Sequence, residues 1–330
     1  MTGPGWHRGL TEGDDSLFAG RPMPGDTAEY PTLTYEVTGR IARLTFNRPE
    51  AGNAITPDTP LDLAAAVERA DLDPRVHVIL LSGRGSGFCA GYDLALFAEQ
   101  DMAAARSAEA RDGTLLDPVA QARNHEAGRV WDPMVDYAMM SRFNRGFASL
   151  LHATKPTVAK LHGYCLAGGS DIALFADQLI AAADTKIGYP PTRVWGIPAA
   201  GMWAHRVGDQ RAKRLLFTGD SITGAEAAEW GLAVEAPPPE ALDERTEILV
   251  GRIARMPLNQ LMMAKLALNS ALLAQGVATS GMISTVFDGI ARHTREGQAF
   301  VDRAETVGFR GAVRDRDEPF GDAGRRVYRG

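Results

Sequence analysis

The sequence predicts an α/β core followed by a helical C-terminal region. Short apolar runs of strand length, such as Val78–Ser82, alternate with glycine-rich turns and helical patterns. Such strands, apolar on both sides, are typical of a sheet covered on both faces. Beyond residue 240 the pattern is helical almost to the end. We therefore expect a flexible arm over residues 1–30, an α/β core over 31–240 and a helical C-terminal region over 241–330.

The first elements of the core follow from simple patterns. Residues 33–37 and 41–46 alternate apolar and polar side chains around Thr-Gly-Arg, which predicts a hairpin. Residues 58–70 have helical spacing, and an apolar strand over 76–82 follows them. The order strand, turn and helix then repeats, which is why an α/β arrangement is expected.

The C-terminal region divides into three predicted segments. Residues 258–273 are expected to form a strongly amphipathic helix, and residues 282–306 a second helix. The charged stretch 308–321 is expected to be extended.

Bulk composition restricts the class of protein. The chain has 330 residues, of which 45% are hydrophobic and 23% charged, as in an ordinary globular protein. A formal net charge of −6 argues against nucleic-acid binding. No apolar run has membrane-spanning length and the N-terminus lacks a signal-peptide pattern, so a cytoplasmic location is expected. The two cysteines, Cys89 and Cys165, are expected to be reduced.

The run Lys155–Asp171 carries the strongest chemical signal. It is a short apolar strand, a glycine hinge and the first turn of a helix that carries a carboxylate. Unpaired backbone N–H groups at a helix start hold negatively charged oxygen. A second glycine-rich turn, Gly83–Gly87, follows another strand and precedes Phe88–Leu94. Backbone donors beside an acid favour chemistry on a carbonyl group.

These residues resemble the enoyl-CoA hydratase/isomerase (crotonase) superfamily. The motifs that carry the resemblance occur in the family's order over roughly residues 30 to 310: Asn47–Glu50 with Asn53-Ala54, Phe88–Leu94, His162–Asp171, Ala176–Ala183, Gly196–Pro198, Leu216–Asp220 and Ala225–Leu232. The resemblance implies a crotonase-like spiral of repeated ββα units. It also implies C-terminal helices that assemble the protein into homotrimers or hexamers.

The resemblance implies a substrate and a set of site residues. The substrate is an acyl-CoA thioester of lipid metabolism, so coenzyme A arrives with the substrate and no cofactor is permanently bound. The oxyanion hole would consist of the backbone amides of Tyr92 and Gly168, and Asp171 would move protons. Candidate CoA-binding residues are Arg48, Ala90, Tyr92, Leu94 and Gly168. No His, Cys or Asp cluster has the sequence spacing of metal ligands, so no metal is expected.

One departure from the family pattern affects the expected reaction. Asp171 stands where typical hydratases have one catalytic glutamate, and Pro191 stands where they have the second. Groups in or just before the variable pocket region are candidates to replace it: His125, Glu126, Asp132, Asp136 and Tyr137. Tyr189 and Arg193, beside Pro191, are candidates to hold a substrate carboxylate or a polar head group. Trp131, Tyr137, Tyr189 and Trp195 are candidate pocket walls that would favour a bulky or aromatic acyl group.

The reaction implied first is that of an enoyl-CoA hydratase, a lyase that adds water to a 2-enoyl-CoA. The alternatives are an enoyl-CoA isomerase, an acyl-CoA thioester hydrolase, or a non-catalytic CoA-binding relative. The expected partners are an acyl-CoA thioester and further copies of the chain, with no nucleic acid and no membrane.

Overall fold

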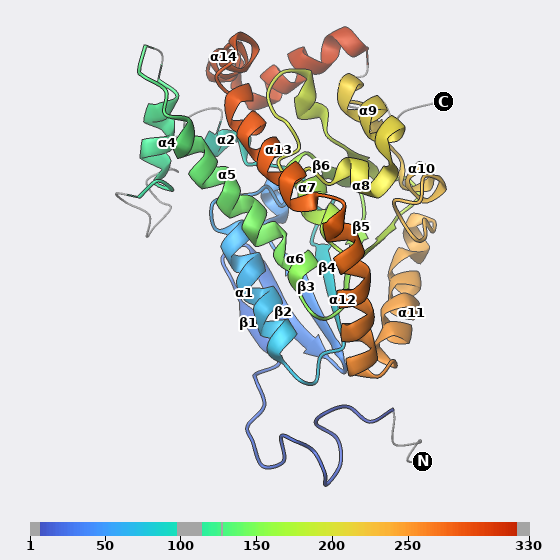
Figure 1. The fold of residues 1–330 in the computed structure, drawn as a ribbon. Coiled ribbons are helices and arrows are strands. Elements are labelled where there is room, and N and C mark those ends of the chain that lie inside the picture. The colour runs from blue at the N-terminus through green and yellow to red at the C-terminus, as the bar shows by residue number, and fades with distance from the viewer. Residues whose placement is uncertain (1–6, 98–113, 127, 322–330) are drawn as a thin grey trace.

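The computed structural model describes residues 7–97, 114–126 and 128–321, and a six-stranded sheet forms its centre (Figure 1). The strand order is β1-β2-β3-β4-β5-β7. The strands are β1 (Thr27–Glu29), β2 (Leu33–Thr38), β3 (Ile41–Phe46), β4 (Val78–Gly83), β5 (Thr157–Leu161) and β7 (Gln178–Ala181). Strands β1 to β3 are antiparallel and the remaining neighbours pair in parallel. The sheet therefore begins as a meander and continues as an α/β sheet.

The predicted hairpin is confirmed as β2 and β3, which pair in full register from Leu33 opposite Phe46 to Thr38 opposite Ile41. The expected arm over residues 1–30 includes one regular element, because β1 pairs with β2 at the edge of the sheet. Arg75 of the core ion-pairs with Asp26 just before this strand.

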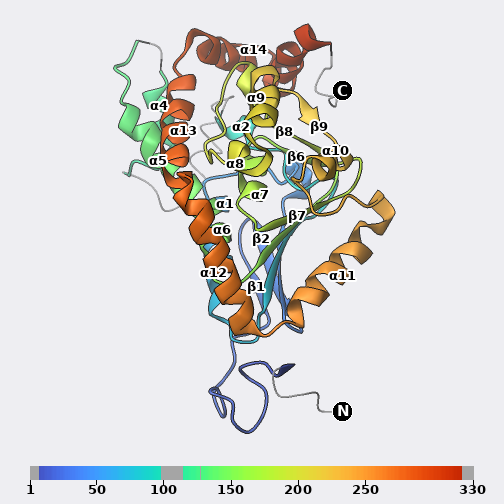
Figure 2. The same cartoon turned by 45° about the vertical axis from the view of Figure 1, so that its right-hand side comes forward.

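Helices cover both faces of the sheet. On one face, α1 (Thr59–Leu72) packs with α5 (Pro133–Phe147) and α6 (Ser149–His152), and it contacts β2 and β3. On the other face, α11 (Leu242–Ala254) contacts β3, β4 and β7, and it stands apart from the other helices in Figure 2. Alternate strand residues serve the two faces, so that Leu81 joins the larger core and Leu80 the cluster under α11.

A second, three-stranded sheet lies beside the first. It has the order β6-β8-β9, with β6 (Tyr164–Leu166), β8 (Lys186–Gly188) and β9 (Ser221–Ile222). Strand β6 leads directly into α7 (Gly168–Leu174), every residue of which is buried. The predicted strand, hinge and helix are therefore present, with β6 as an additional strand within the hinge.

The C-terminal region is helical, with α12 (Leu258–Ala274), α13 (Val277–Ala291) and α14 (Arg295–Asp317). The prediction of extended structure over 308–321 is wrong, because α14 continues past a kink at Gly308 through this charged stretch. The helix predicted over 258–273 is present as α12, but its predicted amphipathic pattern is wrong. Only Leu258 and Lys265 are buried in α12, while several apolar side chains lie exposed. Helix propensity is satisfied there, but the single chain does not cover the apolar surface.

Shorter helices complete the described chain: α2 (Leu94–Phe97), α4 (Pro118–Asn124), α8 (Trp203–Val207), α9 (Asp209–Thr218) and α10 (Gly224–Glu229). Among the described residues, no single helix meets the length and hydropathy needed to cross a membrane. Taken together, α12 and α13 do meet them, with a bend of 58° between the two helices.

Candidate active site

The two glycine-rich turns predicted from the sequence pack directly against each other. Cys89 and Cys165 form a parallel β-bridge, and the amide of Leu166 donates to the carbonyl of Cys89 at 3.0 Å. Gly91 has a φ of +104°, and a Cβ atom added there would lie 2.7 Å from the Cβ of Ala167. A side chain at position 91 is therefore excluded by backbone conformation and by close approach alike.

Two backbone N–H groups are left unpaired where these turns meet. The neighbours of Tyr92 are held by a strand-like pairing, because Ile55 donates to Gly91 and Asp93 donates to Ile55. Tyr92 and Gly168 themselves donate to no acceptor within the described part of the chain. Ala167, which precedes Gly168, has a strained backbone with φ 51° and ψ −127°. The arrangement offers two donors to a ligand oxygen.

An apolar cavity of about 180 Å³ adjoins the turns. Its described lining residues are Ala90, Tyr92, Leu94, Phe97, Met139, Met140, Phe143, Leu166, Ala167, Tyr189, Pro190, Pro191, Val194, Trp195, Gly196, Asp288, Arg292, Phe300, Val313 and Arg316. The glycine turns supply one wall, which includes the predicted residues Ala90, Tyr92 and Leu94. Helices α13 and α14 supply much of the facing wall. Of the predicted aromatic walls, Tyr189 and Trp195 line the cavity, whereas Trp131 stacks on His293.

Asp171 lies on the buried first turn of α7. Its side chain is 0% exposed, and neither carboxylate oxygen has a hydrogen-bond partner at normal geometry among the described residues. Burial raises the pKa of this carboxyl well above its usual value, and the charge of Asp288 adds to the effect. The nearby backbone of Ala199 and Ala200 acts weakly in the opposite direction. Burial therefore favours the protonated form of this carboxyl.

A second carboxylic acid at the cavity, Asp288 on α13, was not predicted from the sequence. This side chain is 4% exposed, lines the cavity and forms an ion pair of 2.9 Å with Arg292 one turn later. The signal that was available is a lone charged pair at i and i+4 within an otherwise apolar helical stretch. Its position in the cavity depends on how α13 packs, which the pattern does not show.

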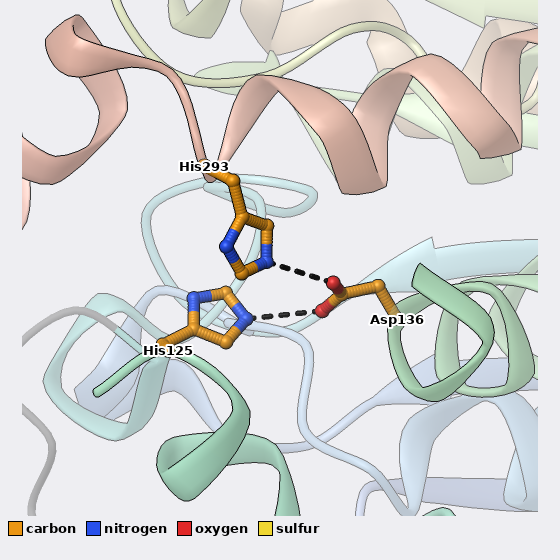
Figure 3. Close-up of side chains that lie close together, drawn as sticks. All are labelled: His125, Asp136 and His293. Carbon is orange, nitrogen blue, oxygen red and sulfur yellow. Dashed lines mark hydrogen bonds and ion pairs between the residues drawn. The ribbon is translucent and has the colours of Figure 1, made fainter. Parts of the chain in front are cut away.

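Asp136 was predicted as a candidate to replace the second glutamate, and its contacts hold the segment between α4 and α5 in place. Its buried carboxylate accepts hydrogen bonds from Trp131 at 2.7 Å and Asn124 at 3.3 Å, and it pairs with the Nε2 atoms of His125 and His293 at 3.0 and 2.9 Å (Figure 3). These partners lower the pKa of Asp136 despite its burial. The cluster connects α5 to the segments after α4 and α13.

The same cluster has the types of side chain that bind a metal cation. One atom each from His125, Asp136 and His293 lie within 4.8 Å of one another, and imidazole with carboxylate suits zinc. The sequence spacing gave no hint of it, because the three residues come from distant segments. The four hydrogen-bond donors around Asp136 already account for its burial, and the expectation of no metal stays a prediction.

The other candidates for the missing acid have structural partners. Asp132 caps α5 by accepting from the amide of Met134, and Glu126 pairs with Arg129 at the surface. Arg193 is 2% exposed and binds Asp317 at 3.0 Å, so it holds the end of α14 and is not an anchor for a substrate carboxylate.

Arg48, the candidate for CoA phosphate, ties the first turn together. Its guanidinium donates to the carbonyl of Ala54 at 2.7 Å and pairs with Asp93 at 3.1 Å. The side chain keeps 26% of its surface exposed. Its CoA role stays a prediction.

Comparison with known proteins identifies relatives along most of the chain. The family model described as Enoyl-CoA hydratase/isomerase matches residues 36–123 and 133–307. A probable enoyl-CoA hydratase from Rhizobium meliloti is 31% identical over 254 residues, which is 75% of this chain and 86% of that protein. The 2,3-dehydroadipyl-CoA hydratase of Escherichia coli is 28% identical over 278 residues, 82% of this chain and 96% of that protein.

A solved structure of an enoyl-CoA hydratase from Mycobacterium smegmatis is 70% identical to the chain. It covers 91% of this chain and 97% of its own, with a TM-score of 0.85. A second structure, an enoyl-CoA hydratase/isomerase from Xanthobacter autotrophicus Py2, is 26% identical with a TM-score of 0.71 and covers 88% and 99% of the two chains. The crotonase-like fold predicted from the motifs is confirmed.

Proposed function

The chain belongs to the enoyl-CoA hydratase/isomerase family and is an acyl-CoA enzyme of the hydratase type, and on that premise we propose that it adds water across the double bond of a 2-enoyl-CoA thioester. The observation that carries the proposal is the pair of unpaired amides of Tyr92, which lines the apolar cavity, and Gly168, which directly follows the lining residue Ala167. Donors preset for a developing oxyanion stabilise an enolate, and removing one typically costs about 10²–10³ in rate.

Asp171 is proposed as the acid that protonates the α-carbon. It lies three residues after Gly168, on the same face of α7, so a thioester held by the Gly168 amide brings its α-carbon towards this turn. The raised pKa supports the role, because it favours the protonated form of the carboxyl, which is the form that can donate a proton. Electrostatic interactions of this carboxyl with Tyr92 and Tyr189 place it near both phenols.

The acyl group is proposed to be apolar. Aromatic and aliphatic side chains dominate the cavity, and they favour a hydrocarbon or aromatic chain over a charged one. Ala90, Leu94 and Arg48 are proposed to hold the CoA portion at the mouth of the first turn. Coenzyme A belongs to the substrate, and the proposal needs no resident cofactor. A cytoplasmic location stays a prediction.

Self-association through α12 and α13 is proposed as the basis of a homotrimer or hexamer. Exposed apolar side chains gather on these two helices: Met263, Leu266, Leu268, Leu273, Met282, Ile283, Val286, Phe287 and Ile290. Patches of this kind mark protein interfaces. Leu268→Glu should lower the mass measured by light scattering, whereas Leu72→Glu on α1, at an equally exposed leucine, should leave it unchanged. Equal masses for both variants and the wild type would contradict this interface.

The reaction is tested by following the conjugated-enoyl absorbance of short, long and aromatic 2-enoyl-CoAs. Wild type should remove the absorbance, and Asp171→Asn should do so at least about 10²-fold more slowly because the α-carbon loses its proton donor. Binding of the esters without any loss of absorbance would contradict hydration.

A further inference from the structure

A carboxylate faces the cavity from the helical wall. Asp288 is the one carboxylate-bearing residue among the described residues that line it, while Pro191, where the sequence resemblance places a second glutamate, lines it without any polar side-chain atom. Resting on the function proposed above, we propose that Asp288 is the general base that takes a proton from the attacking water.

The position of Asp288 fits the missing group. Its Oδ1 atom accepts a hydrogen bond of 3.1 Å from the amide of Ile197. A Cβ atom added at Gly196 would lie 3.0 Å from the Cβ of Pro191 and 3.7 Å from the same Oδ1. The carboxylate from α13 therefore packs against the segment that supplies the second glutamate in typical hydratases.

Two protein donors hold the carboxylate of Asp288 in place and leave it able to accept a hydrogen bond from water. Arg292 donates to Oδ2 at 2.9 Å and is itself fixed by a contact with the sulfur of Met140. Each oxygen has one protein donor and about two acceptor sites, so a lone pair remains for a water molecule.

The proposed proton transfers add up to the addition of one water molecule across the double bond. Asp288 accepts one proton from water while the water oxygen bonds to the β-carbon. The π electrons of the double bond move to the thioester, whose oxygen is held by the amides of Tyr92 and Gly168. Asp171 then gives its proton to the α-carbon as the enolate collapses. One proton returns from Asp288 to Asp171 through solvent before the next cycle, so only water is consumed.

The acid and base assignments follow different environments. Asp171 is fully buried and forms no ion pair with another described residue, whereas Asp288 is paired with Arg292. Pairs of carboxyl groups kept in opposite protonation states are a recurring device for acid and base roles. The lining of the cavity would thus provide the base, and Asp171, buried on α7 behind that lining, the acid.

The test compares Asp288→Asn, Asp288→Glu and Asp209→Asn in the full-length protein. Asp209 forms the same kind of i, i+4 ion pair with Lys213 on the exposed surface of α9, so its variant controls for loss of a helix pair. Hydration of a 2-enoyl-CoA is measured together with the absorbance shift of a bound aromatic enoyl-CoA, which reports polarisation by the backbone amides. Asp288→Asn should hydrate about 10²–10⁴-fold more slowly, with the shift and the ester affinity retained. Asp288→Glu should recover part of the rate, and Asp209→Asn should match wild type.

Two results would overturn the assignment. Hydration by Asp288→Asn within about threefold of wild type would remove Asp288 from the reaction while leaving the proposed hydratase function intact. Loss of the absorbance shift and of affinity together with the rate would show that the ion pair only supports the cavity. A wild type that hydrates no enoyl-CoA would contradict both this proposal and the function on which it rests.

Discussion

The two walls of the cavity are built in different ways. The glycine wall, made of residues 83–94 and 162–171, presents backbone amides whose geometry is set within a few residues of sequence. The helical wall, made of α13 and α14, presents side chains such as Asp288, Arg292 and Arg316 from the far end of the chain. Local backbone chemistry can be recognised in a sequence, whereas a side chain delivered by tertiary packing cannot.

The largest effect on the hydration rate is expected from adding a side chain at Gly91 in the glycine wall. Gly91→Ala would force a Cβ atom to within 2.7 Å of Ala167 at a φ of +104°, which displaces the adjacent amide of Tyr92. Hydration should fall about 10²–10³-fold and the absorbance shift of a bound enoyl-CoA should disappear. Gly251→Ala, at a glycine of α11 with open space around it, should behave as wild type. An unchanged shift in Gly91→Ala would mean that the turn does not form the oxyanion hole.

The next effect concerns the anchoring of the helical wall. Arg193 is buried between Asp317 at the end of α14 and Asp220, at 3.0 and 3.4 Å. Arg193→Met removes the cation that joins these two carboxylates. Because Asp317 keeps its pair with Arg316 and Asp220 keeps its pair with Arg214, the free energy of unfolding should fall by about 1.5–3 kcal/mol. Chemical denaturation measures the change. Arg303→Met, which breaks an exposed pair with Asp315 on the same helix, should change stability little. Similar losses in both variants would contradict the anchoring role.

A smaller effect separates the two acids by the pH dependence of stability. The pKa of Asp171 is raised in the folded protein, so its contribution to stability is complete below about pH 4, where the unfolded chain also holds the proton. That stability is lost as the pH rises towards the folded-state pKa. Asp171→Asn removes this dependence, and its melting temperature relative to wild type should increase by a few degrees between pH 4 and pH 8. A difference that falls with pH would contradict a buried, protonated Asp171.

The smallest effect concerns the two cysteine thiols of the glycine wall, which are expected not to react with thiol reagents in the folded protein. Burial raises the pKa of Cys89 to about 12, and it raises that of Cys165 as well. Both cysteines are free thiols, yet neither should react with a thiol reagent at pH 8 in the folded protein. Both should react after denaturation. Rapid modification of the native protein would show that the packing between the two turns opens readily.

The sequence predicted the parts of the site that depend on local pattern. The glycines around Tyr92 and Gly168 indicated the turns, and the position of Asp171 on α7 followed from three residues of spacing. Asp288 was missed because its role depends on α13 crossing the far side of the cavity. The charged stretch 308–321 was expected to be extended because its composition is polar, but its helix packs Ala312 against Phe300 and Ala304. Tertiary contacts of this kind override local composition.

The most direct test of the account is the hydration rate of Asp171→Asn, Asp288→Asn and the double variant beside wild type on one 2-enoyl-CoA. If Asp171, buried behind the glycine wall, and Asp288 on the helical wall act in one reaction, each single variant loses most of the rate. The double variant should then be slower than the slower single variant by no more than about tenfold, because residues that act as a unit are not additive. Full activity in either single variant would contradict the account that Asp171 and Asp288 share the proton transfers.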